Sequence, residues 1–308
     1  MWIILAFISA FCLGFYDVSK KIALRDNKVI DVLTISVCIS ALFLSLPLIL
    51  SRVCPQMMEQ THFFIPRLDW NAHLLVVLKS AIVLTSWVFS YISLKNLPIS
   101  VVSPLQATRP MWTLIGAMLL FGERLNSWQW VGVMLAIGTI FLFSIHNVKL
   151  SSTLQFRLSR FNFYHLCLAL AIITGACSGL YDKYLMRRFD HNAVQVYYTF
   201  YQALMMLVTW AVINRKNLKS EILNLKSVNK SGVIVLISLF LIVSDNTYML
   251  ALRDPDSMIA VVSTIRRGGA VIGFAYGLIF LRENDPWRKI LCMVGILAGL
   301  ICLAFGSI

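Results

Sequence analysis

The sequence predicts an all-α polytopic membrane protein with ten transmembrane helices, arranged as two inverted five-helix repeats. Composition is the first reason, because 59% of the residues are hydrophobic, 13% are charged and the mean hydropathy is +0.78. A soluble chain of 308 residues needs a larger polar surface than this. The second reason is that apolar stretches of about 20 residues, the length that crosses a bilayer of about 30 Å, recur along the chain. The third is a short internal repeat.

The apolar blocks between polar breaks define the expected helices in order. The first block lacks the basic segment of a signal peptide and continues into "YDVSKK" rather than into a cleavage site. None of the breaks has the character of a folded soluble domain, including the longest ones at 52–71, 146–160 and 214–230. The ten expected spans are 2–24, 29–51, 72–94, 98–121, 126–145, 161–185, 192–213, 231–252, 256–281 and 286–306.

The internal repeat consists of three short matches that keep their order and nearly keep their spacing. "GFYD" at Gly14–Asp17 recurs as "GLYD" at Gly179–Asp182, "VVS" at 101–103 recurs at 261–263, and Glu123 corresponds to Glu283. Because five spans is an odd number, the second copy must lie inverted in the membrane. Inverted repeats are typical of transporters that bind substrate between the two halves near the midplane and work by alternating access. We expect repeats at 1–145 and 161–308, joined by a connecting loop at 146–160.

Two further patterns carry a family resemblance. Gly14 and Lys20 mark the first span, and the segment Tyr91–Leu142 contains "FGERL" followed by "WQWVGVMLAIG". Together they resemble the EamA repeat of the drug/metabolite transporter superfamily. The second copy is more divergent, with "LREND" in place of "GERL" and "STIRRGG" in place of "SPLQATRP". The resemblance implies a ten-helix bundle that carries small metabolites, with the fourth and ninth helices lining a central cavity, and it does not identify a substrate.

Charged residues lie inside the predicted spans, where an arginine at mid-bilayer costs roughly 2.5–3.5 kcal/mol. Arg109 is near the centre of the fourth span, and Arg266 and Arg267 are adjacent in the ninth. Intramembrane charges usually face the bundle interior or a water-filled cavity. The candidate substrate-binding residues are therefore Arg109, Arg266, Arg267, Lys79, Gln106, Asp245, Asn246, Trp87 and Tyr91.

The two adjacent arginines raise a question of direction. Neighbouring residues on a helix point about 100° apart, so we expect that Arg266 and Arg267 do not project into one spot and do not both face the cavity. One hypothesis pairs one arginine with Asp245 and leaves the other facing the cavity. The alternative is that both arginines form ion pairs with Asp245, Asp182 or Asp17 and never touch substrate, because an unpaired buried charge costs several kcal/mol.

Positive charge predominates at mid-depth, where Arg109, Arg266, Arg267 and Lys79 stand against Asp245. This excess favours a substrate with a carboxylate, phosphate or sulfonate, which guanidinium groups bind in a bidentate manner. It argues against a lipophilic cation, which would require an unpaired acid and aromatic walls.

The repeat-related carboxylates Asp17 and Asp182 have two interpretations. They could couple transport to protons, or they could pair with one of the neighbouring lysines Lys20, Lys21 and Lys183. The glycines have a packing interpretation, because the spacing of Gly269 and Gly273, and of Gly295 and Gly299, lets helix backbones approach closely in lipid. Gly175–Gly179 has the same spacing.

The leading hypothesis is a secondary transporter of small anionic or zwitterionic metabolites, an exporter by family analogy. No P-loop occurs, which argues against ATP as the driving force. A membrane-embedded enzyme is disfavoured because the five histidines form no HExxH pair and no GxSxG motif occurs. A carrier or flippase of a lipid-linked phosphate cargo stays open, because arginines would suit its phosphate as well.

No cofactor and no metal site is expected, and the seven cysteines are read as single, reduced residues. The net charge of +13 is spread over short connections, which favours contact with anionic lipid rather than nucleic acid.

The expected partners are a small-molecule substrate and membrane lipid, and the expected location is the bacterial inner (plasma) membrane, as a monomer or homodimer. Orientation stays open, since the distribution of Lys and Arg would place both termini outside whereas the family resemblance implies cytoplasmic termini.

Overall fold

The computed structural model describes residues 1–24, 27–97, 105–106, 108–150, 163–215, 231–280 and 286–307. Within these ranges every regular element is an α-helix. In chain order the helices are α1 (Trp2–Ala23), α2 (Val29–Val53), α3 (Pro55–Glu59), α4 (Trp70–Asn96), α6 (Arg109–Phe121), α7 (Ser127–Leu150), α8 (Phe163–Met186), α9 (His191–Ile213), α11 (Ser231–Arg253), α12 (Ile259–Arg267), α13 (Ala270–Ile279) and α14 (Pro286–Gly306).

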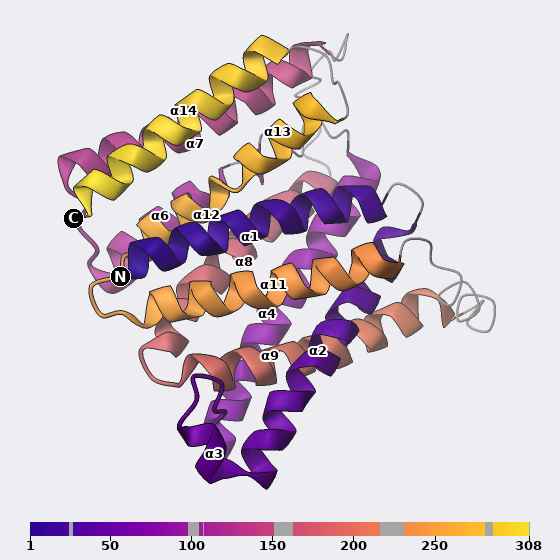
Figure 1. Cartoon of the computed structure of the whole chain (residues 1–308). Helices are drawn as coiled ribbons and strands as arrows, with labels where there is room; N and C mark the ends of the chain where they lie inside the picture. Colours follow the sequence, from indigo (N-terminus) through magenta and orange to yellow (C-terminus); the bar gives the residue numbers. More distant parts are fainter. Residues whose placement is uncertain are drawn as a thin grey trace.

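The long helices lie side by side as a bundle, with both chain ends at the same end of it (Figure 1). α1 packs along α11, α4 along α8, α7 along α14, and α2 along α9. Each of these pairs joins a helix from the first half of the chain to a helix from the second half. The largest apolar core contains residues of α1, α6, α8, α11, α12 and α14, so the two halves share one interior.

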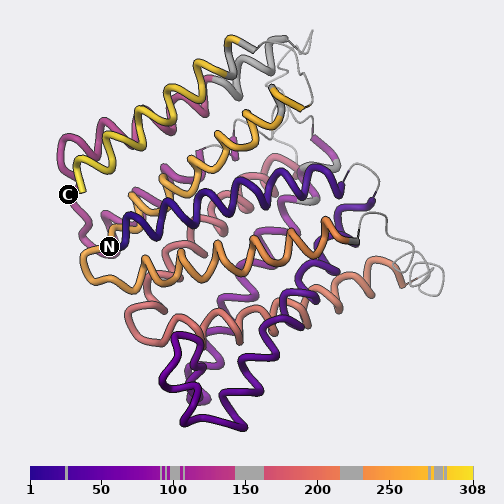
Figure 2. Tube along the Cα trace, in the orientation of Figure 1, coloured from indigo at the N-terminus to yellow at the C-terminus, as the bar shows by residue number. Residues whose placement is uncertain are grey.

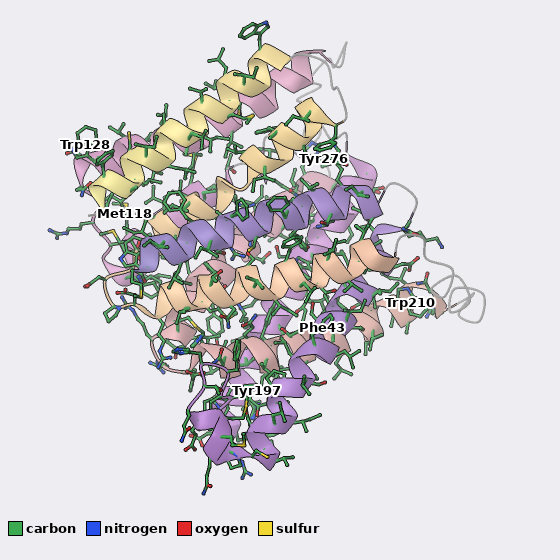
Figure 3. The ribbon with its side chains drawn as sticks, in the orientation of Figure 1. Phe43, Met118, Trp128, Tyr197, Trp210 and Tyr276 are labelled. Carbon is green, nitrogen blue, oxygen red and sulfur yellow. The ribbon has the colours of Figure 1, made fainter. Side chains whose placement is uncertain are left out.

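The outer surface of the bundle is apolar. Large side chains such as Leu119 (80% exposed), Phe43 (44%) and Trp128 (61%) face outward, and Figure 3 labels the last two. An apolar surface of this extent is what lipid tails would cover. Of the described helices, α1, α2, α4, α8, α9 and α11 contain the 6 stretches that are long and apolar enough to cross a membrane, and shorter apolar helices lie at Arg109–Phe121, Ser127–Leu142 and Ile290–Gly306.

Most predicted spans agree with the helices to within a few residues, but two predicted boundaries are wrong. α7 continues to Leu150, so the predicted connecting loop at 146–160 cannot begin at 146, and 151–160 lie outside the described residues. The fourth span was predicted as one helix over 98–121, whereas α6 begins at Arg109 after a turn at Thr108. Pro110 explains this start, because proline lacks an N–H and fits the first turn of a helix without cost. Arg109 therefore lies at the start of a helix instead of its centre.

The ninth span was predicted as one helix over 256–281, and this is also wrong, because α12 and α13 are separate helices. Figure 2 shows the chain running from one to the other. At the break, the N–H of Gly268 donates to the Ile265 carbonyl (2.8 Å) and the N–H of Gly269 to the Arg266 carbonyl (3.2 Å). Successive glycines weaken a helix, since glycine loses the most backbone entropy on ordering.

Gly269 also brings this break into direct contact with α1. A Cβ atom at position 269 would lie 2.4 Å from the Ala10 carbonyl oxygen, and one at Gly14 would lie 2.6 Å from the Gly269 carbonyl oxygen. The packing predicted for Gly269 is therefore confirmed. The packing predicted for Gly273 is wrong, because no described atom outside its own helix lies within 4 Å of a Cβ placed there.

Candidate functional site: a cationic cavity

A cavity of about 350 Å³ lies between the two halves of the bundle. Its volume falls within the range of sites that hold small molecules. Its walls come from α1, α4, α6, α8, α9, α11 and α12. The polar and aromatic side chains that line it are Tyr16, Asp17, Lys20, Lys79, Trp87, Arg109, Thr113, Ser178, Asp182, Tyr198, Asp245, Tyr248, Ser263, Arg266 and Arg267.

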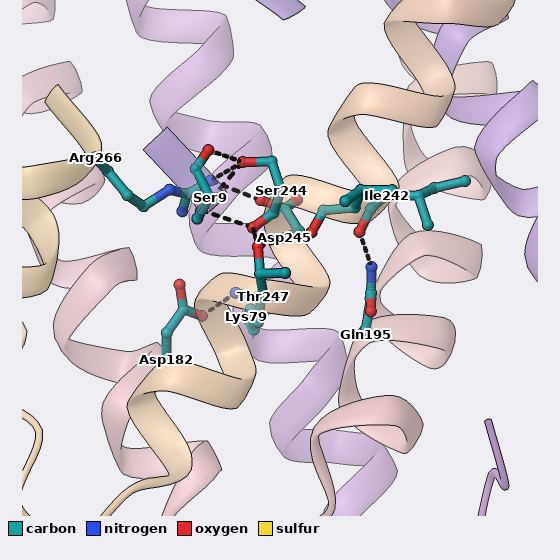
Figure 4. Close-up of polar contacts among 10 residues, drawn as sticks. Ser9, Lys79, Asp182, Gln195, Ile242, Ser244, Asp245, Thr247 and Arg266 are labelled. Atoms are coloured by element: carbon teal, nitrogen blue, oxygen red, sulfur yellow. Dashed lines mark hydrogen bonds and ion pairs between the residues drawn. The ribbon is translucent and has the colours of Figure 1, made fainter. Parts of the chain in front are cut away.

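The first ion pair in the cavity wall joins α4 to α8. Lys79 donates to the carboxylate of Asp182, and the two residues are only 3% and 6% exposed. Figure 4 shows this contact below the pair formed by Arg266. The ammonium group of Lys79 also lies over the ring of Tyr198, 4.5 Å from its centre, a cation–π contact that stabilises the charge further.

The lysines predicted as partners of Asp182 do not pair with it. Lys183 is the next residue on α8 and points elsewhere, where it pairs with Glu123. Sequence spacing indicates only lysines that are near Asp182 in the chain or in the repeat, whereas the packing of α4 along α8 brings Lys79 to it. Asp17 is close enough to Lys20, and to Arg267 and Arg266, to attract these cations electrostatically.

The second ion pair holds Arg266 against α11. Its guanidinium donates to the carboxylate of Asp245 (2.8 Å) and to the hydroxyl of Ser244 (3.3 Å), and it lies over the ring of Tyr248, 4.1 Å from the centre. Ser244 in turn exchanges hydrogen bonds with Ser9 of α1, as Figure 4 shows. Arg266 is therefore fixed by three side chains of one helix and is only half-buried.

Arg267 and Arg109 have a different environment. The side chain of Arg267 is exposed, and within the described part of the chain it forms no hydrogen bond or ion pair that would fix it. The guanidinium of Arg109 donates to the backbone carbonyl of Gly175 (2.5 Å) and reaches no carboxylate among the described residues. A Cβ at position 175 would lie 2.4 Å from Cζ of Arg109, so the absence of a side chain at Gly175 makes room for the guanidinium.

The prediction that Arg266 and Arg267 cannot both face the cavity is wrong, since both line it. Their side chains point in different directions, as the helix geometry requires, but the cavity is wide enough for both to line it. Arg266 turns towards Asp245, and Arg267 is left without a fixed partner among the described residues. Both stand at the C-terminal end of α12, where the negative end of the helix dipole favours cations.

The other candidates are distributed as follows. Trp87 lines the cavity. Gln106 donates to the hydroxyl of Ser90 and Asn246 donates to Asn192 and Gln195, and neither residue belongs to the cavity wall. Asn246 follows Asp245 on α11, and the 100° step between neighbours turns it towards α9. The side chain of Tyr91 lies outside the described residues.

Tyr248 and Glu123 are residues of this region that the candidate set omitted. Tyr248 follows Asp245 by three residues, a spacing that places both on one helix face and could have indicated it. Glu123 was noted only for the repeat. Gly122 ends α6 in the left-handed conformation (φ 65°), and this turn directs the chain so that Glu123 meets another helix. Its repeat counterpart Glu283 lies outside the described residues.

Glu123 holds the start of α12, the helix that carries the arginine pair. Its carboxylate accepts the N–H groups of Ile259 (2.7 Å) and Ala260 (3.1 Å) and the ammonium of Lys183 (3.1 Å). Lys183 also donates to the carbonyl of Ser257. Glu123 is 9% and Lys183 2% exposed. A carboxylate at a helix start satisfies orphan N–H groups and complements the positive end of the dipole.

Comparison with known proteins concerns the family and the fold. The model of the EamA-like transporter family matches residues 1–145, and no curated protein matches the chain. The fold is similar to that of a protein of known crystal structure, with a TM-score of 0.70 and 10% sequence identity over 99% of this chain and 96% of the other. At this identity the likeness concerns the fold alone. Residues 1–145, slightly less than half of the chain, thus match the EamA-like transporter family, and the apolar helices are those of a multi-pass membrane protein, as that family's transporters are.

Proposed function

We propose that the protein is a secondary transporter that binds a small anionic or zwitterionic metabolite in the cationic cavity. The observation that carries this proposal is that Arg109 and Arg267 lack a carboxylate partner among the described residues. Both line the cavity, and within the described residues neither is hydrogen-bonded to a carboxylate. A guanidinium charge inside a membrane is costly without a partner, and a bound carboxylate, phosphate or sulfonate would supply one.

The balance of charge in the cavity supports the same class of substrate. Two of its cations are neutralised by the pairs Lys79–Asp182 and Arg266–Asp245. The cations left in the described wall are Lys20, Arg109 and Arg267, and the acid left is Asp17. The net positive charge favours an anion, and Asp17 would offer a place for the ammonium group of a zwitterion. A role for Asp17 or Asp182 in proton coupling stays part of the proposal.

The packing of the helices supports alternating access by two inverted repeats, at 1–145 and 161–308, with ten spans in all. If the halves are exchanged, the pair α1–α11 becomes α8–α4, and both pairs are present. The pairs α2–α9 and α7–α14 each join a helix to its own counterpart. Such a pattern is expected from a two-fold axis in the membrane plane. Export as the direction and the bacterial inner membrane as the location rest on family analogy.

The proposal is tested with purified protein in liposomes, by measuring uptake and efflux of a panel of amino acids and organic anions. We expect Arg267→Gln to lower anion transport by roughly 10- to 100-fold, the effect of losing one or two charge-assisted hydrogen bonds. Arg124→Gln is the matched control, because Arg124 is exposed and does not line the cavity.

Equal transport by wild type and Arg267→Gln would remove Arg267 from the substrate site. Tight binding of a quaternary ammonium dye, without binding of any anion, would contradict the charge argument as a whole. Movement of a phospholipid-linked phosphate between leaflets, with no flux of soluble anions, would indicate the flippase instead.

A second variant tests Arg109 through its neighbour. In Gly175→Ala the added methyl group would collide with the guanidinium of Arg109, and this flexible group is expected to shift while the helices stay in place. Anion transport should fall to a level near that of Arg109→Gln, with unfolding stability changed by less than about 0.5 kcal/mol. Gly179→Ala is the matched control one turn along α8, because the nearest atom to its added Cβ is 3.8 Å away. Equal activity of the two glycine variants would contradict the prediction.

A further inference from the structure

A second, smaller pocket of about 50 Å³ adjoins the cationic cavity. It lies between α2, α4, α9 and α11, and it shares Trp87, Tyr198, Leu241 and Asp245 with the cavity wall. A single water molecule needs roughly 10–15 Å³ of such space. The pocket therefore has room for a terminal group of a few heavy atoms, adjoining the arginine-lined space.

Gln202 is the feature of this pocket that lacks an explanation within the protein. The residue is 1% exposed, and neither its amide nitrogen nor its amide oxygen has a hydrogen-bond partner among the described residues. An unsatisfied buried polar group costs about 1–3 kcal/mol, and most such groups in native proteins have a protein or water partner.

Three other polar side chains around the pocket, Ser40, Gln195 and Thr199, are already hydrogen-bonded within the protein. Ser40 donates to the Ser36 carbonyl and Thr199 to the Gln195 carbonyl. Gln195 donates to the Ile242 carbonyl, as Figure 4 shows, and accepts from Asn246. Gln202 is thus the fully buried side chain in this described wall whose donor and acceptor both remain available to a ligand.

The chemistry of the primary amide narrows the ligand group. It offers an N–H donor and a carbonyl acceptor together, and a carboxamide or a hydroxyl group matches both. A carboxylate would leave the carbonyl unpaired and would approach the negative Asp245 in the same wall. An ammonium would leave the N–H groups unpaired, and a methyl group would satisfy neither.

We propose that the pocket around Gln202 is a specificity subsite for the end of the transported molecule opposite its anionic group, and that it selects a neutral hydrogen-bonding terminus, a carboxamide or a hydroxyl. This inference rests on the proposed function, because the arginines must hold the anionic end. It deepens that function by predicting an elongated substrate with one charged and one neutral polar end.

The test uses the purified full-length protein and three sets of isosteric anions, with affinity measured by calorimetry. Succinamate, glutaramate and adipamate carry a carboxamide end, the methyl ketones of the same lengths carry an acetyl end, and succinate, glutarate and adipate carry a second carboxylate. We expect the best carboxamide to bind wild type at least tenfold more tightly than its methyl ketone, about the value of one buried hydrogen-bond donor.

Gln202→Leu should abolish this preference by weakening the carboxamide, which loses two hydrogen bonds, at least tenfold more than the methyl ketone, which loses one, and Gln202→Met should do the same. Arg267→Gln should instead weaken all members of the series together. Equal affinities of the wild type for carboxamide and methyl ketone, or an equal loss for both in Gln202→Leu, would overturn the subsite and leave the anion site standing. Absence of binding of every probe to wild type would contradict the anion site itself, and the subsite with it.

Discussion

Replacing Lys79 by methionine is expected to lower the free energy of unfolding by about 3–5 kcal/mol, the usual cost of breaking a buried ion pair by removing one partner. Asp182 is 6% exposed and would be left as a buried, unpaired carboxylate. The contact of Lys79 with the Tyr198 ring would be lost as well. The measurement is reversible unfolding of the purified protein in mixed micelles.

The double variant Lys79→Met with Asp182→Leu provides the decisive comparison. It removes both charges, and buried ion pairs replaced by apolar residues often lose no stability. We expect most of the lost stability to return. Lys20→Met is the matched control, because Lys20 also lines the cavity and is only half-buried. A double variant as unstable as Lys79→Met would show that the loss comes from packing and not from the charge.

Replacing Glu123 by alanine is expected to have an effect of similar size on stability and a larger one on transport. The variant would leave the N–H groups of Ile259 and Ala260 and the ammonium of Lys183 without their carboxylate. Because α12 ends at Arg267, a shift at its start moves the arginine pair. We expect transport at least tenfold below wild type, at a temperature where the variant is still folded.

Two variants separate the contributions of Glu123. Glu123→Gln keeps an oxygen that can accept from the helix start but loses the charge opposite Lys183, so it should fall between wild type and alanine. Arg124→Ala changes the exposed next residue and should alter stability by less than about 0.5 kcal/mol. If Glu123→Ala unfolds like wild type, the anchor does not hold the helix as its geometry implies.

Hydropathy was sufficient to predict most helices of this fold, because each span must satisfy its own backbone and the length of the bilayer limits its ends. The eighth span, for example, was predicted at 231–252, and α11 is Ser231–Arg253. Both mispredicted spans carry arginine near their predicted centres. Their hydropathy is continuous, but Pro110 and the pair Gly268–Gly269 set local backbone geometry that an average over a window does not register.

Charged residues are rare in transmembrane spans, and this rule was enough to predict the charged members of the candidate site. Arg109, Arg266, Arg267 and Lys79 do line one cavity. Their partners could not be predicted with the same rule. The pairing of Lys79 with Asp182 depends on which helices from the two halves lie side by side, and a one-dimensional pattern does not contain this. Gln202 shows the same limit, because only the positions of its neighbours show that its amide has no partner among the described residues.

The direct contact between the backbones at Gly14 and Gly269 has a mechanical consequence. The Gly269 carbonyl occupies the space of a Cβ at Gly14, and the Ala10 carbonyl occupies that of a Cβ at Gly269, so neither glycine has a side chain that could rearrange to absorb a displacement of α1 relative to the break between α12 and α13. Asp17 and Lys20 on α1 and Arg267 on α12 should therefore move as one stiff wall of the cavity. We therefore expect motions that open or close the cavity to come from its other walls rather than from sliding at this contact.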